Sequence, residues 1–103
     1  MNSHELQLAL LKHQRERNNF KSSKRGKLDI ISEILVYCEH KKTKTSIMYN
    51  TNLNHVQLKN HLDSLTTQGL LAKNLNLYIT TKKGYRFLEL FVQINDLLDE
   101  FNP

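Results

Sequence analysis

Three polar side chains between residues 55 and 68 have the chemistry needed to contact nucleic-acid bases. Apolar residues recur in this segment every three or four positions, which predicts an amphipathic helix. Gln57, Lys59 and Asn60 lie on or beside its polar face. Amide side chains can pair with adenine edges, and a lysine can contact a phosphate or a guanine. Asp63 opposes this interpretation because a carboxylate repels phosphates, and an ordinary solvated helix face is the alternative.

The other reactive side chains do not form a catalytic or metal-binding pattern. Cys38 is the single cysteine, which excludes an internal disulfide and any zinc site that needs two thiolates. His55 and His61 are six residues apart on one predicted helix and so face different directions. The sequence has no glycine-rich phosphate loop and no His-Glu-x-x-His helix. We therefore expect a protein that is not an enzyme, with no metal, no cofactor and no small-molecule ligand.

The composition describes a single small domain with an uneven charge. The chain has 103 residues, of which 39% are hydrophobic, and its net charge is +5. Residues 1–27 carry +5, residues 28–84 carry +3 and residues 85–103 carry −3. A basic surface of this kind attracts polyanions. Because the sequence shows neither an export leader nor an apolar membrane span, we expect a cytoplasmic protein that does not enter a membrane.

The N-terminal part of the chain is predicted to stand apart from the core. Asn2 and Glu5 resemble a capping box, and leucines follow at helical spacing, which predicts an amphipathic helix that frays beyond Arg17. Residues 18–26 combine turn-forming and basic side chains, as a linker or basic arm does. We therefore assign residues 1–23 to a segment outside the main domain.

Two helices are predicted at the start of the core. Apolar residues at three- and four-residue intervals predict a helix from Leu28 to Glu39, and Cys38 lies on its buried stripe. A lysine-rich turn follows. Thr43 or Thr45 can then cap a short second helix, which the turn-forming residues 50–52 end.

A third helix, a hairpin and a last helix complete the pattern. Asn54 can cap the helix His55 to Gln68, and Gly69 suits a left-handed residue at its end. The period then changes to two between residues 71 and 80, where the triplet 74–76 supplies the turn of a short hairpin. Thr81 can cap a final helix that runs to about residue 101.

This order of elements, with several specific residues, resembles the archaeal winged-helix DNA-binding proteins. The resemblance rests on Lys44-Thr45-x-Ile47, on Leu53-Asn54-x-x-Gln57-Leu58-Lys59-x-x-Leu62, on Gly69-Leu70-Leu71, and on Tyr78-Ile79-Thr80-x-Lys82 with Gly84. It implies an α+β, mainly helical fold, in which residues 24–81 form a winged helix-turn-helix domain and residues 82–103 a dimerisation helix. Members of this group commonly pair through a long C-terminal helix, so the resemblance implies a homodimer.

The predicted DNA contacts come from three parts of the domain: the entry of the second helix, the third helix and the wing. Helix entries and lysines hold phosphates, while the third helix faces the base edges. The predicted contact residues are Lys42, Lys44, Thr45, Asn54, His55, Val56, Gln57, Lys59, Asn60, Lys73, Asn74 and Asn76. For each lysine, a solvated surface charge is the alternative.

Large apolar residues in the last helix are spaced by four and three, as in the heptad seam of a coiled coil. These residues are Phe87, Phe91, Ile94, Leu98 and Phe101. One small domain cannot cover so many apolar side chains along a helix of this length, so we expect a partner helix. The alternative is that the first part packs on the chain's own core and that leucines of the N-terminal segment cover the rest.

Together these features predict a homodimeric protein that binds double-stranded DNA, either as a transcription regulator or as a nucleoid-associated protein. The third helix would enter the major groove, and the short wing would contact the backbone. The alternative hypothesis is a winged-helix module that binds other proteins and not DNA, because a fold alone does not determine function.

Overall fold

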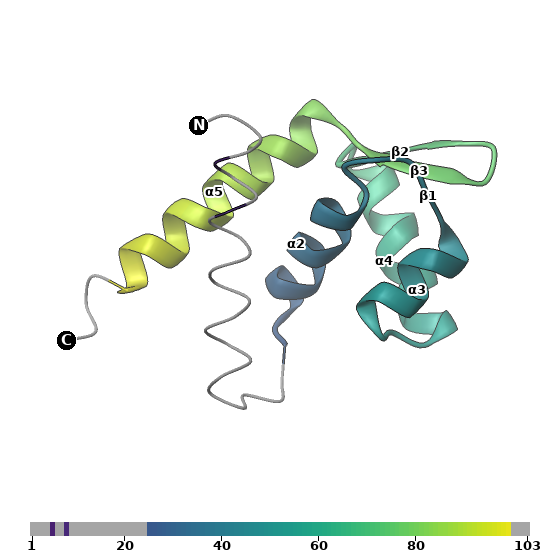
Figure 1. Cartoon of the computed structure of the whole chain (residues 1–103), viewed down its shortest axis with the longest axis horizontal. Helices are drawn as coiled ribbons and strands as arrows, with labels where there is room; N and C mark the ends of the chain where they lie inside the picture. Colours follow the sequence, from purple (N-terminus) through teal and green to yellow (C-terminus); the bar gives the residue numbers. More distant parts are fainter. Residues whose placement is uncertain (1–4, 6–7, 9–24, 100–103) are drawn as a thin grey trace.

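The computed structural model describes Glu5, Leu8 and residues 25–99. The elements are α2 (Lys27–Tyr37), β1 (Lys42–Thr43), α3 (Lys44–Thr51), α4 (His55–Thr67), β2 (Leu71–Asn74), β3 (Leu77–Thr80) and α5 (Lys82–Asp99). In Figure 1, α2, α3 and α4 form the body, the hairpin of β2 and β3 projects to one side, and α5 extends to the other. The predicted N-terminal helix and basic arm, and the end of the last helix with Phe101, lie largely outside the described residues.

Local signals begin and end the helices as predicted. The Thr43 hydroxyl accepts a hydrogen bond from the Ser46 N–H (3.2 Å), so Thr43, and not Thr45, is the N-cap of α3. Asn52 ends α3 in a left-handed conformation (φ 57°). Gly69 follows α4 with a φ of 79°, a value that L side chains rarely adopt.

A short strand, β1, lies within the segment that the sequence predicted only as a turn. Lys42 and Thr43 pair in antiparallel fashion with Tyr78 and Leu77 of β3. The sheet order is therefore β1-β3-β2, with β3 in the centre. Two residues are too few for any hydrophobic period, and their partners are more than thirty positions away in the chain, so local sequence patterns did not predict this strand.

The hairpin forms at the predicted place, and its two-residue loop consists of Leu75 and Asn76. Leu71 pairs with Thr80 and Asn74 with Leu77. The buried face of β3 consequently carries Tyr78 and Thr80. Inside the core, Thr80 donates from its hydroxyl to the Leu35 carbonyl at 2.6 Å, which fastens the wing to α2.

Helix α5 starts in tight contact with the preceding loop. Thr81 caps it by accepting from the Gly84 N–H (3.1 Å). A Cβ at Gly84 would collide with the Leu70 carbonyl oxygen and would lie 2.6 Å from the Thr80 methyl group. Only glycine therefore fits at this position, and the direction in which α5 leaves the sheet is fixed by backbone packing.

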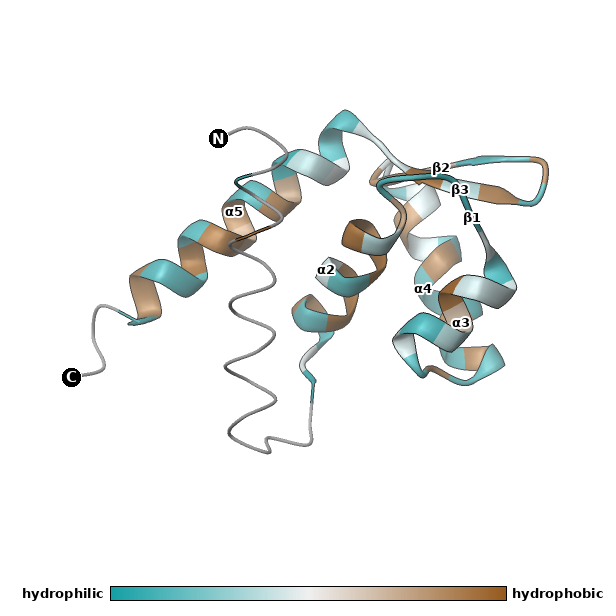
Figure 2. Ribbon diagram, in the orientation of Figure 1, coloured by the Kyte–Doolittle hydropathy of each residue, from teal (hydrophilic) through white to brown (hydrophobic). Residues whose placement is uncertain are grey.

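The core joins α5 to the other helices. Its buried apolar residues are Ile31, Ile34, Leu35, Cys38, Ile47, Leu53, Leu58, Leu62, Leu65, Leu70, Leu71, Tyr78, Leu88, Phe91 and Val92. Figure 2 shows apolar colour on the inner sides of the helices and again along α5 toward its C-terminal end. Burial raises the pKa of the Cys38 thiol to about 12, with a smaller opposing effect from Lys42. The first half of α5 is thus part of the same hydrophobic core as α2.

Candidate nucleic-acid interface

The polar face of α4 is exposed, as the sequence predicted. His55, Val56, Gln57, Lys59 and Asn60 are all exposed, whereas the leucines of the opposite stripe are buried. The hydrophobic stripe holds α4 against the core, and the polar side chains consequently point to solvent. This arrangement presents a mainly polar ridge, with the exposed Val56 in its first turn, that could face a DNA groove.

The first turn of α4 uses two of the predicted contact residues for its own cap. Asn54 Oδ1 accepts from the Gln57 N–H (2.8 Å), and Gln57 Oε1 accepts in return from the Asn54 N–H (3.2 Å). This reciprocal pair is a capping box with an asparagine and a glutamine. A bidentate contact with adenine uses both the oxygen and the NH2 group of the Gln57 side chain. Because this oxygen already accepts from the Asn54 N–H, such a contact would require the cap to open.

An ion pair occupies the middle of the same face. Lys59 Nζ lies 2.8 Å from Asp63 Oδ2, one turn further along α4, and both side chains are exposed. The hydrogen bond from Lys59 lowers the pKa of Asp63, and the charges of Lys59, Lys44 and Lys73 lower it further, although desolvation opposes them. The same hydrogen bond raises the pKa of Lys59.

Lysines from three separate elements act on the Asp63 carboxylate and lower its pKa. Lys44 begins α3, Lys59 lies within α4 and Lys73 lies in β2, yet the charges of all three act on this one carboxylate. The fold therefore brings together the three parts of the chain that were predicted to contact DNA. The resulting surface, which we call the basic face, is formed by Lys44, Lys59 and Lys73 around Asp63.

Two lysines flank the central strand of the sheet. Tyr78 pairs with Lys42 of β1 on one side and with Lys73 of β2 on the other. The Lys73 ammonium lies over the Tyr78 ring, 5.6 Å from its centroid, and the Lys42 ammonium lies 4.8 Å from the centroid of the Tyr37 ring. These cation–π contacts orient the side chains of Lys42 and Lys73, and no pattern in the sequence predicted them.

The predicted contacts outside α4 differ in how exposed they are. Thr45 is exposed in the first turn of α3, and Lys42 and Lys44 are half-buried. Asn74 and Asn76 are exposed on either side of the wing tip. Since the first amides of a helix have no partner within that helix, the start of α3 provides donors suited to a phosphate.

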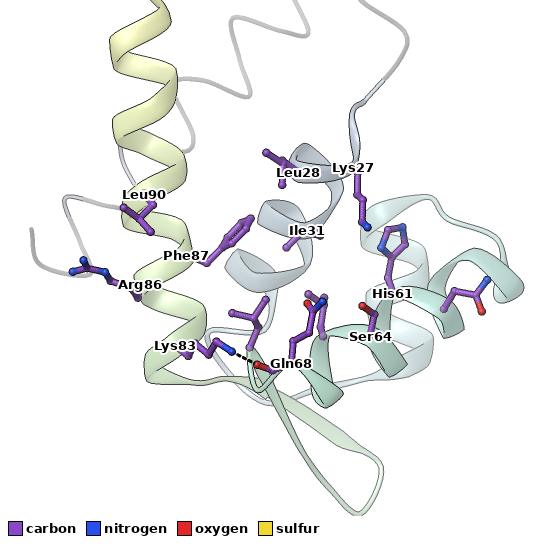
Figure 3. A pocket seen from close by; sticks show the side chains of 13 residues that line it. Lys27, Leu28, Ile31, His61, Ser64, Gln68, Lys83, Arg86, Phe87 and Leu90 are labelled. Atoms are coloured by element: carbon purple, nitrogen blue, oxygen red, sulfur yellow. Dashed lines mark hydrogen bonds between the residues drawn. The ribbon is translucent and has the colours of Figure 1, made fainter.

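A groove between α2, α4 and α5 is a feature that sequence reasoning missed. It has a volume of about 770 Å³ and is lined by apolar residues such as Ile31, Phe87 and Leu90, with Lys27 and His61 on the side opposite α5 (Figure 3). At one edge the Lys83 ammonium donates to the Gln68 carbonyl at the end of α4, as the dashed line in Figure 3 marks. Burial, and then the charge of Lys27, lower the pKa of His61.

The predicted dimer seam on α5 is largely buried in its first part and exposed in its second part. Phe91 is buried in the chain's own core, and its ring stacks on that of Phe87 at a centroid distance of 6.4 Å. From Leu90 onward, an exposed apolar stripe runs along another side of α5, and its residues keep 44% to 58% of their surface accessible. This α5 stripe consists of Leu90, Ile94, Leu97 and Leu98. It continues the groove, because Leu90 belongs to both.

Other kinds of site are not seen in the described part of the chain. Among Glu5, Leu8 and residues 25–99, no three histidine, cysteine or acidic side chains are placed as metal ligands would be. No helix within these residues combines the length and the apolar composition of a membrane span. The exposed chemistry of this region is therefore dominated by the basic face and the α5 stripe.

Comparisons with known proteins agree with this geometry. Residues 24–99 match the family model described as winged helix-turn-helix. The crystal structure of Sso10a-2, a DNA-binding protein from Sulfolobus solfataricus, is similar, with 32% sequence identity and a TM-score of 0.62. That match covers 74% of this chain and 87% of the other. No curated protein matches significantly. The predicted resemblance and fold class are thus confirmed, and the chain belongs to the winged helix-turn-helix family.

Proposed function

We propose that this protein is a homodimer that binds double-stranded DNA, with α4 in the major groove and the wing on the backbone. The observation that carries the proposal is the exposed polar face of α4, where Lys59 and Asp63 pair at 2.8 Å and where the charges of Lys44 of α3 and Lys73 of β2 also act on Asp63. Phosphates would replace this carboxylate as the partners of the lysines. The family match and the DNA-binding function of the similar protein support the proposal.

The roles of the side chains follow from their positions. Lys59 and Asn60 are exposed at the centre of α4 and would contact base edges or the adjacent phosphates. Lys44 and Thr45 at the start of α3 would hold one backbone, and Lys73 another. Of the other predicted contacts, His55 and Val56 lie beside the cap on the first turn of α4.

The cap and the ion pair suggest modest sequence preference. Asn54 and Gln57 serve the helix cap, and Lys59 must exchange Asp63 for a new partner before it contacts DNA. Few side chains of α4 are then left for base-specific contacts, so the protein would bind many sequences with similar affinity. Such behaviour suits a nucleoid-associated protein in the cytoplasm at least as well as an operator-specific regulator.

Dimerisation would use the α5 stripe. An exposed apolar band on a helix that extends from the body favours a second helix as its cover (Figure 1). Two copies joined in this way would present two basic faces to one duplex, and the α5 helices would set the distance between them.

The proposal is tested by titrating the protein into a fluorescent random-sequence duplex at low and at physiological salt. We expect tight binding that weakens steeply with salt, and we expect Lys59→Ala/Asn60→Ala to weaken it and to lower the salt slope by about one. The matched control is Arg86→Ala/Gln93→Ala, which removes the same chemistry from exposed positions of α5.

Two results would contradict the proposal. Equal losses for both double variants would mean that binding depends on overall charge and not on α4. No binding at low salt would favour the second candidate, a module that binds other proteins, for which the groove and the α5 stripe offer the contact surface.

A further inference from the structure

The tip of the wing carries a leucine in a conformation that leucine disfavours. Leu75 is the first of the two loop residues of the hairpin, its φ is 58°, and 86% of its surface is exposed. Asn76, the second loop residue, does not have a positive φ. A positive φ at the first of two loop residues is required by the turns that close short hairpins, and glycine, asparagine or aspartate usually occupies that position.

Folding alone does not explain a leucine at this position. A left-handed backbone is costly for a residue with a bulky side chain, whereas glycine and asparagine tolerate it. The leucine side chain gains no compensating burial, since it projects into solvent at the hairpin tip. Asparagines stand directly before and after it, at 74 and 76, so residues suited to this backbone occupy the neighbouring positions and not the strained one. Strain without local benefit points to a role in binding.

The surroundings of Leu75 match the minor groove of DNA. The hairpin projects from the body, and its tip is apolar in colour (Figures 1 and 2). Asn74, Asn76 and Lys73 of the basic face flank it and are exposed. The minor groove, about 6 Å wide, does not admit a two-stranded ribbon, but a single side chain at the end of the hairpin can enter it while the strands stay outside. The amides can donate to the acceptors of the base edges there, and apolar side chains are known to enter between base pairs from this groove.

We propose that Leu75 is a wedge that enters the minor groove between two adjacent base pairs, unstacks them partly and bends the duplex. This inference rests on the proposed DNA binding and extends it from docking on DNA to deforming it. Pyrimidine–purine steps such as TA unstack most easily and are the expected points of entry. An isolated leucine beside a lysine and two amides offers too little apolar surface to anchor a protein partner.

The test measures bending separately from affinity. A duplex with a central TA step carries a donor and an acceptor dye at its ends and 2-aminopurine at the step. At saturating wild-type protein we expect higher energy transfer and at least a twofold rise of 2-aminopurine emission. With Leu75→Asn both changes should disappear, while affinity falls by no more than about tenfold.

Two further variants separate the wedge from other effects. Leu75→Met keeps a large apolar side chain and should retain the bend. A retained bend would show that the loss in Leu75→Asn comes from the missing apolar side chain and not from any substitution in the turn. Lys59→Ala should lower affinity but leave the bend at saturation unchanged. Circular dichroism and thermal unfolding of each variant check that the domain still folds, and the better turn residue in Leu75→Asn should preserve stability.

The outcomes distinguish the wedge from DNA binding itself. If wild-type protein binds the duplex without bending it, or if Leu75→Asn bends it equally, the proposal that Leu75 acts as a wedge is wrong. The proposed docking of α4 in the major groove is not affected by that result. If wild-type protein fails to bind at low salt, the proposed function is wrong, and the wedge with it.

Discussion

Lys59 and Asp63 form an ion pair on the exposed face of α4, with 2.8 Å between Nζ and Oδ2. Asp63 is the only acidic residue of this helix, and it lies where Lys44 and Lys73 also act on it. A lysine that precedes its acidic partner by four residues is the less favourable order on a helix, so the pair adds little to stability. Its main effect is to offset the positive charge of the basic face.

Removal of this carboxylate should strengthen DNA binding. We expect Asp63→Asn to raise affinity by about three- to tenfold at low salt, because Lys59 is released and a repulsive charge is lost. The gain should shrink as salt rises. Fluorescence anisotropy with a random duplex measures it, and Asp96→Asn on α5 is the charge-matched control. An equal gain in the control would attribute the effect to net charge.

Polar substitutions in the α5 stripe should dissociate the dimer. Ile94→Ser/Leu98→Ser removes two exposed apolar side chains and leaves the buried core residues of α5 intact. We expect sedimentation equilibrium to show a dimer for the wild type and a monomer for this variant. Gln93→Ser/Asp96→Ser alters the polar side of the same helix and should remain dimeric. A wild-type monomer at micromolar concentrations would contradict the proposed pairing.

Gly84 should tolerate no side chain. Because a Cβ would meet the Leu70 carbonyl oxygen and the Thr80 methyl group, Gly84→Ala should lower the free energy of unfolding by about 1–3 kcal/mol. Urea unfolding followed by circular dichroism measures the loss. Gln93→Ala, an exposed change in the same helix, should be nearly neutral, and a similar result for both would show that the loop adapts easily.

Acid should destabilise the protein partly through His61. Burial and Lys27 lower the folded-state pKa of this ring below its usual 6.5. As the pH falls through this usual value, the unfolded chain binds the proton first, so the free energy of unfolding decreases until the folded pKa is passed. His61→Gln should flatten this part of the stability profile between pH 7 and 5, measured by urea unfolding.

Much of the fold could be predicted because its determinants are local. The caps at Asn54 and Thr81, the left-handed Gly69 and the leucine stripe of α4 each depend on residues within one or two turns. The change of period after Gly69 likewise located the hairpin. These signals also placed Lys59 and Asn60 on the exposed side of α4.

The features that could not be predicted from the sequence depend on contacts between residues that are distant in the chain. β1 exists only because β3 pairs with it, and Phe91 is buried because α2 packs against α5. The spacing of the α5 residues could not show which side of the helix the domain would cover. Gln57 was predicted as a base contact from its residue type, although its position three residues after Asn54 also fits a capping box. The clustering of Lys44 and Lys73 around Asp63 required the tertiary fold.

The burial of Cys38 makes the natural chain a convenient background for labelling. It is the only thiol in the sequence, it is fully covered, and its pKa of about 12 keeps it protonated at neutral pH. Maleimide dyes and spin labels should therefore not react with the folded wild-type protein. A cysteine introduced by Leu75→Cys or Leu98→Cys would be the sole reactive position, so distances across a wing tip or between two copies become measurable without first replacing a native residue.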